Sequence, residues 1–188
     1  MLTSKSDWRK VLRQRRTDIP ADTAANAERQ AAAHLQATRL WADAEHVGLY
    51  LANDGELNAA RIARIAAQSE KTLYLPVIDG QSMHFAAWDP RDPLKNNRYG
   101  IGEPIGERIH AQVLDLLLLP LVGFTQSGYR LGMGGGYYDR FFAAESQFRA
   151  HKLGLAYTCQ RENDLESFRE EWDIDLDSVL TECGIFAC

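Results

Sequence analysis

The chain has 188 residues, of which 45% are hydrophobic and 25% charged, and its formal net charge is -5 at pH 7. This length fits a single domain, residues 1–188. The apolar fraction is large enough for a hydrophobic core that needs neither a bound metal nor disulfides to stabilise it. The acidic balance argues against a protein that coats nucleic acid or an anionic membrane. Three widely spaced cysteines and five scattered histidines indicate neither a disulfide framework nor a zinc site.

The N-terminus lacks the apolar segment of a signal peptide. The longest strongly apolar run, residues 116–124, is far too short to span a membrane. We therefore expect a cytoplasmic protein without membrane contact.

The first half of the chain predicts alternating helices and strands. Residues 3–18 form a helical pattern with a short apolar stripe, and Pro20 interrupts it. Asp18 or Asp22 is expected to cap a second, alanine-rich helix that runs to about Trp41. The next predicted elements are a strand over 46–52, a helix over 57–68 and a hairpin of two strands over 73–78 and 83–88.

The second half opens with a loop rich in Pro, Gly and Asn over 89–108. A nearly continuous apolar strand over 116–124 follows, typical of a strand that is covered on both faces. The remaining predicted elements are a glycine-rich loop over 127–136, a helix over 137–145 and strands over 152–157 and 178–186. Strands that alternate with helices indicate an α/β protein with a mostly parallel sheet. Ligands of such sheets bind beyond the carboxyl ends of the strands.

The segment from Gly128 to Arg140 is the most informative, because four of the five residues 132–136 are glycine. Successive glycines let backbone N–H groups converge, and the start of the following helix adds free N–H donors. A polyphosphate suits such a place, and Arg130 can add a charge-assisted contact. A flexible connector is the alternative, which the position between a buried strand and an aromatic-rich helix disfavours.

The loop matches neither standard phosphate-binding motif. Gly123 and Gly128 have the glycine interval of the P-loop, but Tyr129 stands where that motif needs lysine. The dinucleotide-binding pattern, counted from Gly132, fails because Tyr137 occupies its third glycine position.

Two kinds of side chain beside the loop allow alternative interpretations. Asp139 either stabilises the helix through its dipole or binds Mg²⁺ next to phosphates. Adjacent side chains on a helix diverge by about 100°, so we expect one of Tyr137 and Tyr138 in the core and the other against a flat heterocycle.

A cationic stripe marks the first predicted helix, where spacings of three and four residues bring its charges to one face. Such a stripe is either a solvated surface or a clamp that approaches a phosphate chain from the side opposite the loop. The residues of this stripe are Lys5, Arg9, Arg13 and Arg16.

The segments 119–124 and 128–140 closely resemble the signature of the 5-formyltetrahydrofolate cyclo-ligases, or methenyltetrahydrofolate synthetases. The resemblance extends, in the same order along the chain, to the basic N-terminal helix and to residues 51–56, 74–76, 102–104 and 171–173. It implies a three-layer α/β/α sandwich of the CoA-transferase-like type. It also implies conversion of 5-formyltetrahydrofolate to 5,10-methenyltetrahydrofolate, with ATP as co-substrate and Mg²⁺. ATP would phosphorylate the formyl oxygen, the folate N10 would attack the activated carbon, and phosphate would leave.

The resemblance also implies roles for the residues that match the family pattern. Lys5 and Arg9 would hold ATP phosphates, Asp139 and Asp173 would coordinate Mg²⁺, and Leu51, Glu56 and Tyr137 would line the folate site. Contact with the reacting groups would come from Arg130, Tyr137 and Tyr138. The nucleotide loop would consist of Arg130, Leu131, Gly132, Met133, Gly134, Gly135, Gly136, Tyr137 and Tyr138.

One departure from the family pattern concerns Met133 and Gly135, where some members carry basic side chains. Either the backbone amides suffice here, or Lys5, Arg9 and Arg13 supply the charge.

Competing hypotheses remain at this point. One is a non-catalytic nucleotide- or folate-binding module, and another is a CoA-transferase-like or sugar-phosphate enzyme on the same scaffold, because a fold does not fix a function. A nucleic-acid binder is the least favoured. For the cyclo-ligase we expect folate and ATP as small-molecule partners and a monomeric protein.

Overall fold

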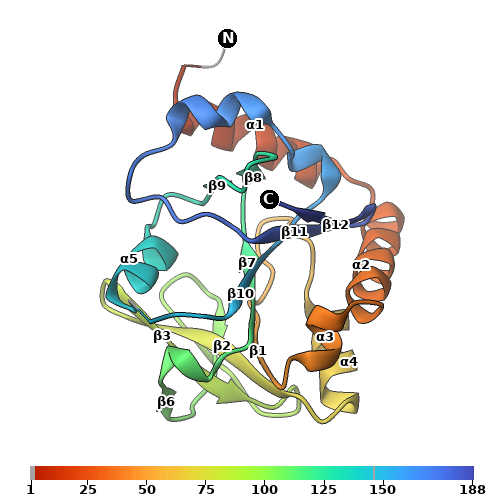
Figure 1. Ribbon diagram of the computed structural model, residues 1–188, viewed down its shortest axis with the longest axis vertical. Coiled ribbons are helices and arrows are strands. Elements are labelled where there is room, and N and C mark those ends of the chain that lie inside the picture. The colour runs from red at the N-terminus through yellow and green to blue at the C-terminus, as the bar shows by residue number, and fades with distance from the viewer. Residues whose placement is uncertain (1–2, 146) are drawn as a thin grey trace.

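The computed structural model describes residues 3–145 and 147–188 and is built around a twisted central sheet (Figure 1). In spatial order its strands are β12 (Gly184–Ala187), β11 (Ser178–Thr181), β10 (His151–Leu155), β7 (Leu116–Pro120), β1 (His46–Gly48), β2 (Thr72–Asp79), β3 (Ser82–Trp88) and β6 (Arg108–Ile109). The pairs from β11 to β2 are parallel, and antiparallel pairs occur at the two edges. The prediction of an α/β protein with a mostly parallel sheet is confirmed.

Helices cover both faces of the sheet. On one face lie α2 (Ala21–Gln36), α3 (Arg39–Asp43) and α4 (Ala60–Gln68), and on the other lies α5 (Tyr137–Ala144) (Figure 1). A further helix, α1 (Lys5–Thr17), crosses the end of the sheet at which the parallel strands finish. None of the helices that the structure describes is long and apolar enough to cross a bilayer.

Strand β7 shows why this layered arrangement is stable. Successive side chains of a strand point to opposite faces, so Leu116 and Leu118 enter the core beneath α2 and α4. Leu117 and Leu119 enter the core beneath α5. All four are buried, and truncation of one such leucine to alanine typically costs about 2–5 kcal/mol.

The apolar strand predicted over 116–124 is in fact two elements. After Pro120 the chain leaves the main sheet, and β8 (Gly123–Phe124) pairs instead with β9 (Arg130–Leu131) in a small hairpin. At Gly123 the backbone passes so close to α1 that a Cβ would lie 2.5 Å from Leu12 Cδ1. The continuous apolar run therefore reflects burial in two different places: the sheet and the underside of α1.

Several other predicted boundaries were wrong. The strand expected over 46–52 ends at Gly48, and the helix expected over 57–68 begins at Ala60. The last predicted strand, 178–186, is the antiparallel hairpin β11–β12, in which the Thr181 hydroxyl accepts the Cys183 N–H in the turn. The loop expected over 89–108 contains the short pair β4 (Lys95–Asn96) and β5 (Gly102–Glu103), followed by β6.

The second predicted helix also divides. It begins after Pro20, which carries no side-chain cap, so neither Asp18 nor Asp22 has the expected role. Asp18 instead ends α1. The helix stops at Gln36, and α3 starts anew because the Thr38 hydroxyl accepts the Trp41 N–H at 3.1 Å.

Candidate functional site

A cavity of about 670 Å³ lies beyond the carboxyl ends of β1, β2 and β7, against α1 and the glycine-rich loop. The structure brings every residue to which the resemblance assigns a role to the wall of this one cavity, whereas Arg13, offered as an additional source of charge, lies outside it. Lys5 and Arg9 belong to α1, Leu51 and Glu56 follow β1, and Asp173 lies in the segment before β11. The loop and helix α5 contribute residues 130–139.

The glycine loop leads directly into α5, and its backbone explains the glycines. Gly134 and Gly136 have φ angles of 95° and 65°, which side-chain-bearing residues rarely adopt. Gly136 is the N-cap of α5 and has no side chain to accept from the first N–H groups of the helix. Those N–H groups have no partner within a helix, so they are available to an anion in the cavity.

Two guanidinium groups hold carbonyl oxygens of the loop. Arg9 Nε donates to the Gly132 carbonyl at 2.8 Å, and Arg140 Nη2 donates to the Gly135 carbonyl at 2.9 Å. The N–H and C=O of a trans peptide point in opposite directions, so the Gly136 N–H points away from Arg140. The loop is thus fixed by protein contacts before any ligand binds.

The cationic stripe of α1 does not act as one uniform surface. Lys5 Nζ bonds Glu170 at 2.7 Å and Asp173 at 3.2 Å, and these two carboxylates raise the pKa of Lys5 against the opposing effect of burial. Arg13 bonds Asp54 at 2.6 Å and lies outside the cavity wall. Within the described residues, Arg9 is the member of the stripe that lines the cavity and makes no ion pair.

Arg16, the fourth member of the stripe, is buried rather than solvated. Its guanidinium bonds the Asp54 carboxylate at 2.9 Å and the Leu121 carbonyl at 3.1 Å, and it lies 3.8 Å from Glu56. Burial raises the pKa of Glu56, while the Asn53 N–H and the Arg16 charge oppose that rise. Glu56 is therefore a mostly buried hydrogen-bond acceptor at the cavity wall, and the guanidinium of Arg16 lies next to it.

The two predicted metal ligands lie on the cavity wall but each already has a cationic partner. Asp139 accepts from Arg130 at 2.7 Å, and Asp173 accepts from Lys5. Among the described residues, no group of three His, Cys, Asp or Glu side chains could hold a metal ion by itself. Any metal here would need most of its oxygen ligands from bound phosphate and water, which is usual for Mg²⁺.

Tyr137 and Tyr138 both reach the cavity, contrary to the expected division into one core residue and one site residue. Both also pack partly against the apolar core beneath α5. The Tyr137 hydroxyl contacts Arg98 and lies 3.0 Å from the Tyr99 hydroxyl. The Tyr138 ring lies beneath the Arg130 guanidinium at 5.5 Å.

Sequence reasoning missed part of the wall, which comes from the segment interpreted as a plain loop. Asn97 Oδ1 accepts the N–H groups of Tyr99 and Ile101, and Asn97 Nδ2 donates to Glu103. Glu103 also accepts the Ile78 N–H at 2.9 Å, which fastens the β4–β5 hairpin to β2. Asn97 and Gly100 are turn residues, and this turn signal within an apolar-flanked segment could have indicated the hairpin. Trp172 also lines this wall. The sequence analysis included it only within the segment 171–173 and gave it no role of its own.

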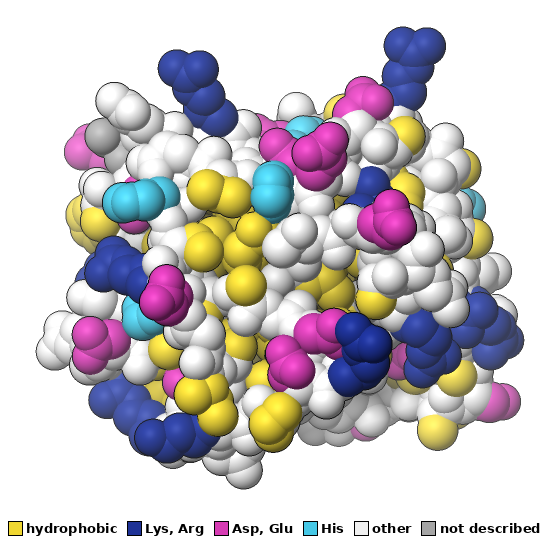
Figure 2. Space-filling view, turned by 90° about the horizontal axis from the view of Figure 1, so that it is seen from below, with side chains coloured by type: hydrophobic (Ala, Val, Ile, Leu, Met, Phe, Trp, Pro, Cys, Tyr) yellow, Lys and Arg dark blue, Asp and Glu magenta, His cyan; other side chains and the backbone are white. Residues whose placement is uncertain are grey.

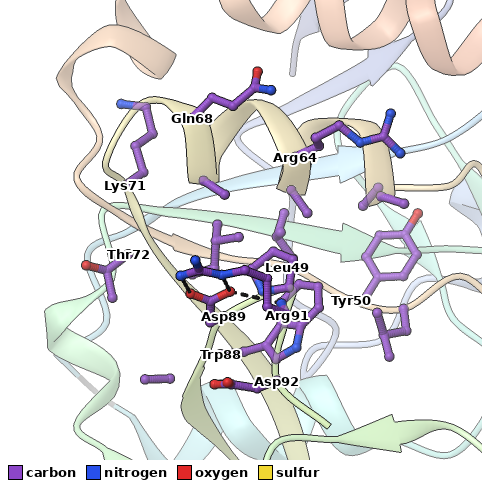
Figure 3. Close-up of a pocket in the computed structure, with 18 residues that line it drawn as sticks. Leu49, Tyr50, Arg64, Gln68, Lys71, Thr72, Trp88, Asp89, Arg91 and Asp92 are labelled. Atoms are coloured by element: carbon purple, nitrogen blue, oxygen red, sulfur yellow. Dashed lines mark hydrogen bonds and ion pairs between the residues drawn. The ribbon is translucent and has the colours of Figure 1, made fainter. Parts of the chain in front are cut away.

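A second hollow, of about 1060 Å³, lies between α4 and the ends of β2 and β3 (Figure 3). Its walls combine alanine and leucine side chains with polar and charged ones, and its Arg91 is paired with Asp89. It adjoins the first cavity through Tyr50 and Leu51, which line both. None of the residues that line it belongs to the glycine-rich loop, so we place the functional site in the first cavity.

The end of the molecule opposite α1 has a different character (Figure 2). There, acidic and basic side chains are interspersed over an apolar floor. Such a surface resembles an ordinary solvated face, in contrast to the converging polar groups around the glycine loop.

The fold and this cavity together define an α/β protein with a glycine-rich loop at a helix start beside a cavity beyond the carboxyl ends of the parallel strands, where ligands of such sheets bind. The model of the 5-formyltetrahydrofolate cyclo-ligase family matches residues 2–182. The chain belongs to the 5-formyltetrahydrofolate cyclo-ligase family, which confirms the resemblance seen in the sequence.

Individual relatives agree. The 5-formyltetrahydrofolate cyclo-ligase of Haemophilus influenzae is 33% identical over 178 residues, covering 92% of this chain and 94% of the relative. The protein of the same name from Escherichia coli is 33% identical over 182 residues, covering 94% and 99%. The solved structure of Aquifex aeolicus 5,10-methenyltetrahydrofolate synthetase matches with a TM-score of 0.86 at 29% identity, covering 97% of this chain and 92% of that one.

Proposed function

We propose that this cavity catalyses the ATP-dependent cyclisation of 5-formyltetrahydrofolate to 5,10-methenyltetrahydrofolate, with release of ADP and phosphate. The observation that carries the proposal is the meeting of the glycine loop, Arg9 and Glu56 on one wall in a member of this family. The hypotheses of a CoA-transferase-like or sugar-phosphate enzyme lose their support, because the family and its named relatives are cyclo-ligases.

The ATP phosphates would lie over the loop. The free N–H groups at the start of α5 and the positive end of its dipole favour a polyanion there. Arg9 would approach from α1 on the other side, as the cavity cation that makes no ion pair among the described residues. Arg130, paired with Asp139, and Lys5, which bonds both Glu170 and Asp173, would reach the phosphates as hydrogen-bond donors more than as free positive charges. This arrangement lets the loop work without basic side chains at Met133 and Gly135.

The reduced pterin would lie at the end of the cavity that contains Glu56. A buried carboxylate is a strong acceptor for the N–H donors of a pterin edge. Leu51 would supply an apolar contact, and the ring of Tyr137, held by Arg98 and Tyr99, would form a fixed aromatic wall. Tyr138 would complete that wall beside Arg130.

Mg²⁺ fits this site as an ion bound chiefly through phosphate oxygens, with Asp139 and Asp173 as the carboxylates that would hold it. Both are hard oxygen donors on the cavity wall. When bound, the ion would offset the charge of the phosphates.

The residues of the chain would act by positioning. The γ-phosphoryl group passes to the formyl oxygen with release of ADP, N10 then attacks the activated formyl carbon and gives up its proton to solvent, and the C–O bond to phosphate breaks. Phosphoryl transfer of this kind depends on alignment and charge neutralisation more than on a protein nucleophile. The fixed loop and the fixed tyrosine wall are suited to holding the two substrates in contact, away from water.

The decisive experiment follows the absorbance of methenyltetrahydrofolate after mixing protein, 5-formyltetrahydrofolate, ATP and Mg²⁺. We expect product only when ATP is present, and one ADP for each product molecule. No turnover at high protein concentration would reject the proposal. Calorimetric binding of ATP and folate without product would instead support the non-catalytic binding module.

Two further expectations stay predictions: a monomer in solution and a cytoplasmic location. Light scattering of the purified chain tests the first, and a mass of twice the 21.2 kDa of one chain would contradict it. Fractionation of cells that produce the protein tests the second.

A further inference from the structure

Trp172 is an exposed aromatic residue at the wall of the cavity. It has 65% of its surface exposed, whereas Trp8 and Trp41 are buried and Trp88 is half-buried. Tyr99 and Met133 are the other large exposed apolar side chains on the same wall. Apolar surface gathered around a cavity usually marks the place where a ligand covers it.

The backbone that carries Trp172 is fixed on both sides. The Asp173 N–H donates to the Glu170 carbonyl at 3.0 Å, and the Glu170 N–H donates to the Asp173 carboxylate at 2.9 Å. Lys5 bonds both carboxylates and ties this turn to α1. Within the part of the chain that the structure describes, the indole itself stacks on no other aromatic ring.

Helix α1 shows which part of the ligand Trp172 faces. Lys5 lies at the Trp172 turn, Arg9 holds the glycine loop, and Arg16 lies beside Glu56. Eleven residues from Lys5 to Arg16 span about 16 Å at the helical rise. The cavity therefore runs from Trp172, past the loop, to Glu56. With phosphates at the loop and the pterin at Glu56, the Trp172 end is left for the rest of the nucleotide.

We infer that the indole of Trp172 stacks on the purine base of ATP and so helps to select a nucleotide over a bare polyphosphate. The inference rests on the proposed function, because it takes the loop as the phosphate site. An exposed tryptophan on a fixed turn is well suited to this role, because it offers a large flat apolar surface and its backbone is already held in place.

Calorimetry on the full-length chain, with ATP and with inorganic tripolyphosphate, tests the inference. The wild type should bind ATP more tightly than tripolyphosphate. Trp172→Ala should weaken ATP about tenfold, within the range for base stacking on an aromatic side chain, and leave tripolyphosphate unchanged. Trp172→Phe should restore most of the ATP affinity. Phe186→Ala, which removes an exposed aromatic side chain outside the cavity wall, should change neither affinity.

Fluorescence gives a second measure, because Trp172 is the exposed indole: ATP should quench the total tryptophan emission of the wild type but leave that of Trp172→Phe, which comes from the other three tryptophans, unchanged. Equal loss of ATP and tripolyphosphate affinity in Trp172→Ala would overturn the inference, and so would a raised KM for the folate with an unchanged KM for ATP. A wild-type protein that turns over folate without binding ATP, or binds no nucleotide at all, would reject the proposed function as well.

Discussion

The Arg9 guanidinium donates from Nε to the Gly132 carbonyl at 2.8 Å, which joins the first helix of the chain to a loop 123 residues later. The same side chain lies 3.3 Å from the place where a Cβ on Gly134 would be. One arginine thus both shapes the loop and stands beside the proposed phosphate site.

Replacing Arg9 with alanine should raise the KM for ATP by about tenfold or more, because a charge-assisted contact contributes about 1.5–3 kcal/mol. Arg13→Ala is the matched control, since Arg13 is one helical turn away and itself lies outside the cavity wall, while its partner Asp54 lines the cavity beside Glu56 and not at the loop. Steady-state kinetics with ATP varied would show the difference. Equal effects of the two substitutions would mean that the stripe acts only through its overall charge.

Gly134→Ala should lower both stability and ATP affinity. A φ of 95° strains any side-chain-bearing residue by about 1–3 kcal/mol, and the new methyl group would press on Arg9. Gly184→Ala is the control, because Gly184 has a φ of 139°, no atom within 4 Å of the place that a Cβ would take, and no part in the cavity wall. Thermal unfolding should show a loss in both variants, and only Gly134→Ala should also weaken ATP binding.

The KM for the folate should rise as the pH falls, because protonation removes the charge of Glu56 and turns one of its two acceptor oxygens into a donor. Burial raises the pKa of Glu56, so this carboxyl takes up its proton at a higher pH than an exposed glutamate. The loss of folate affinity should therefore begin above the usual carboxyl range. Glu56→Gln should bind folate weakly at every pH and remove this dependence, and a wild-type pH profile retained in that variant would show that another group titrates.

Asp139→Asn and Asp173→Asn should each raise the Mg²⁺ concentration needed for half-maximal activity. Asp89→Asn serves as the control, because Asp89 is likewise paired with an arginine but lies in the other hollow. The measurement is a Mg²⁺ titration at saturating ATP. A curve unchanged from that of the wild type in both cavity variants would remove the two aspartates from the proposed metal site.

The sequence was most informative about features that depend only on residues close together in the chain. The run of glycines before Tyr137 predicts a loop with free N–H groups at a helix start, and the structure contains that loop. The alternation of helix and strand patterns along the chain likewise predicted the α/β class. What the pattern could not show was the partner of each charge: Arg16 looked like a solvated residue, yet Asp54 and Leu121 bury it from segments far along the chain.

The boundaries failed for a related reason. Residues 116–124 are apolar throughout, so periodicity cannot separate β7 in the sheet from β8 beneath α1. The β4–β5 hairpin was missed because its strands have two residues each and its stability comes from Glu103, which bonds the Ile78 N–H across the chain. Such long-range contacts leave no local pattern to recognise.

The ion pair between Lys5 and Asp173 joins residues 168 positions apart. This contact can form only once both segments are present in the chain. We therefore expect chains truncated before Asp173 to lack both the partner of Lys5 and part of the cavity wall, and so to be inactive.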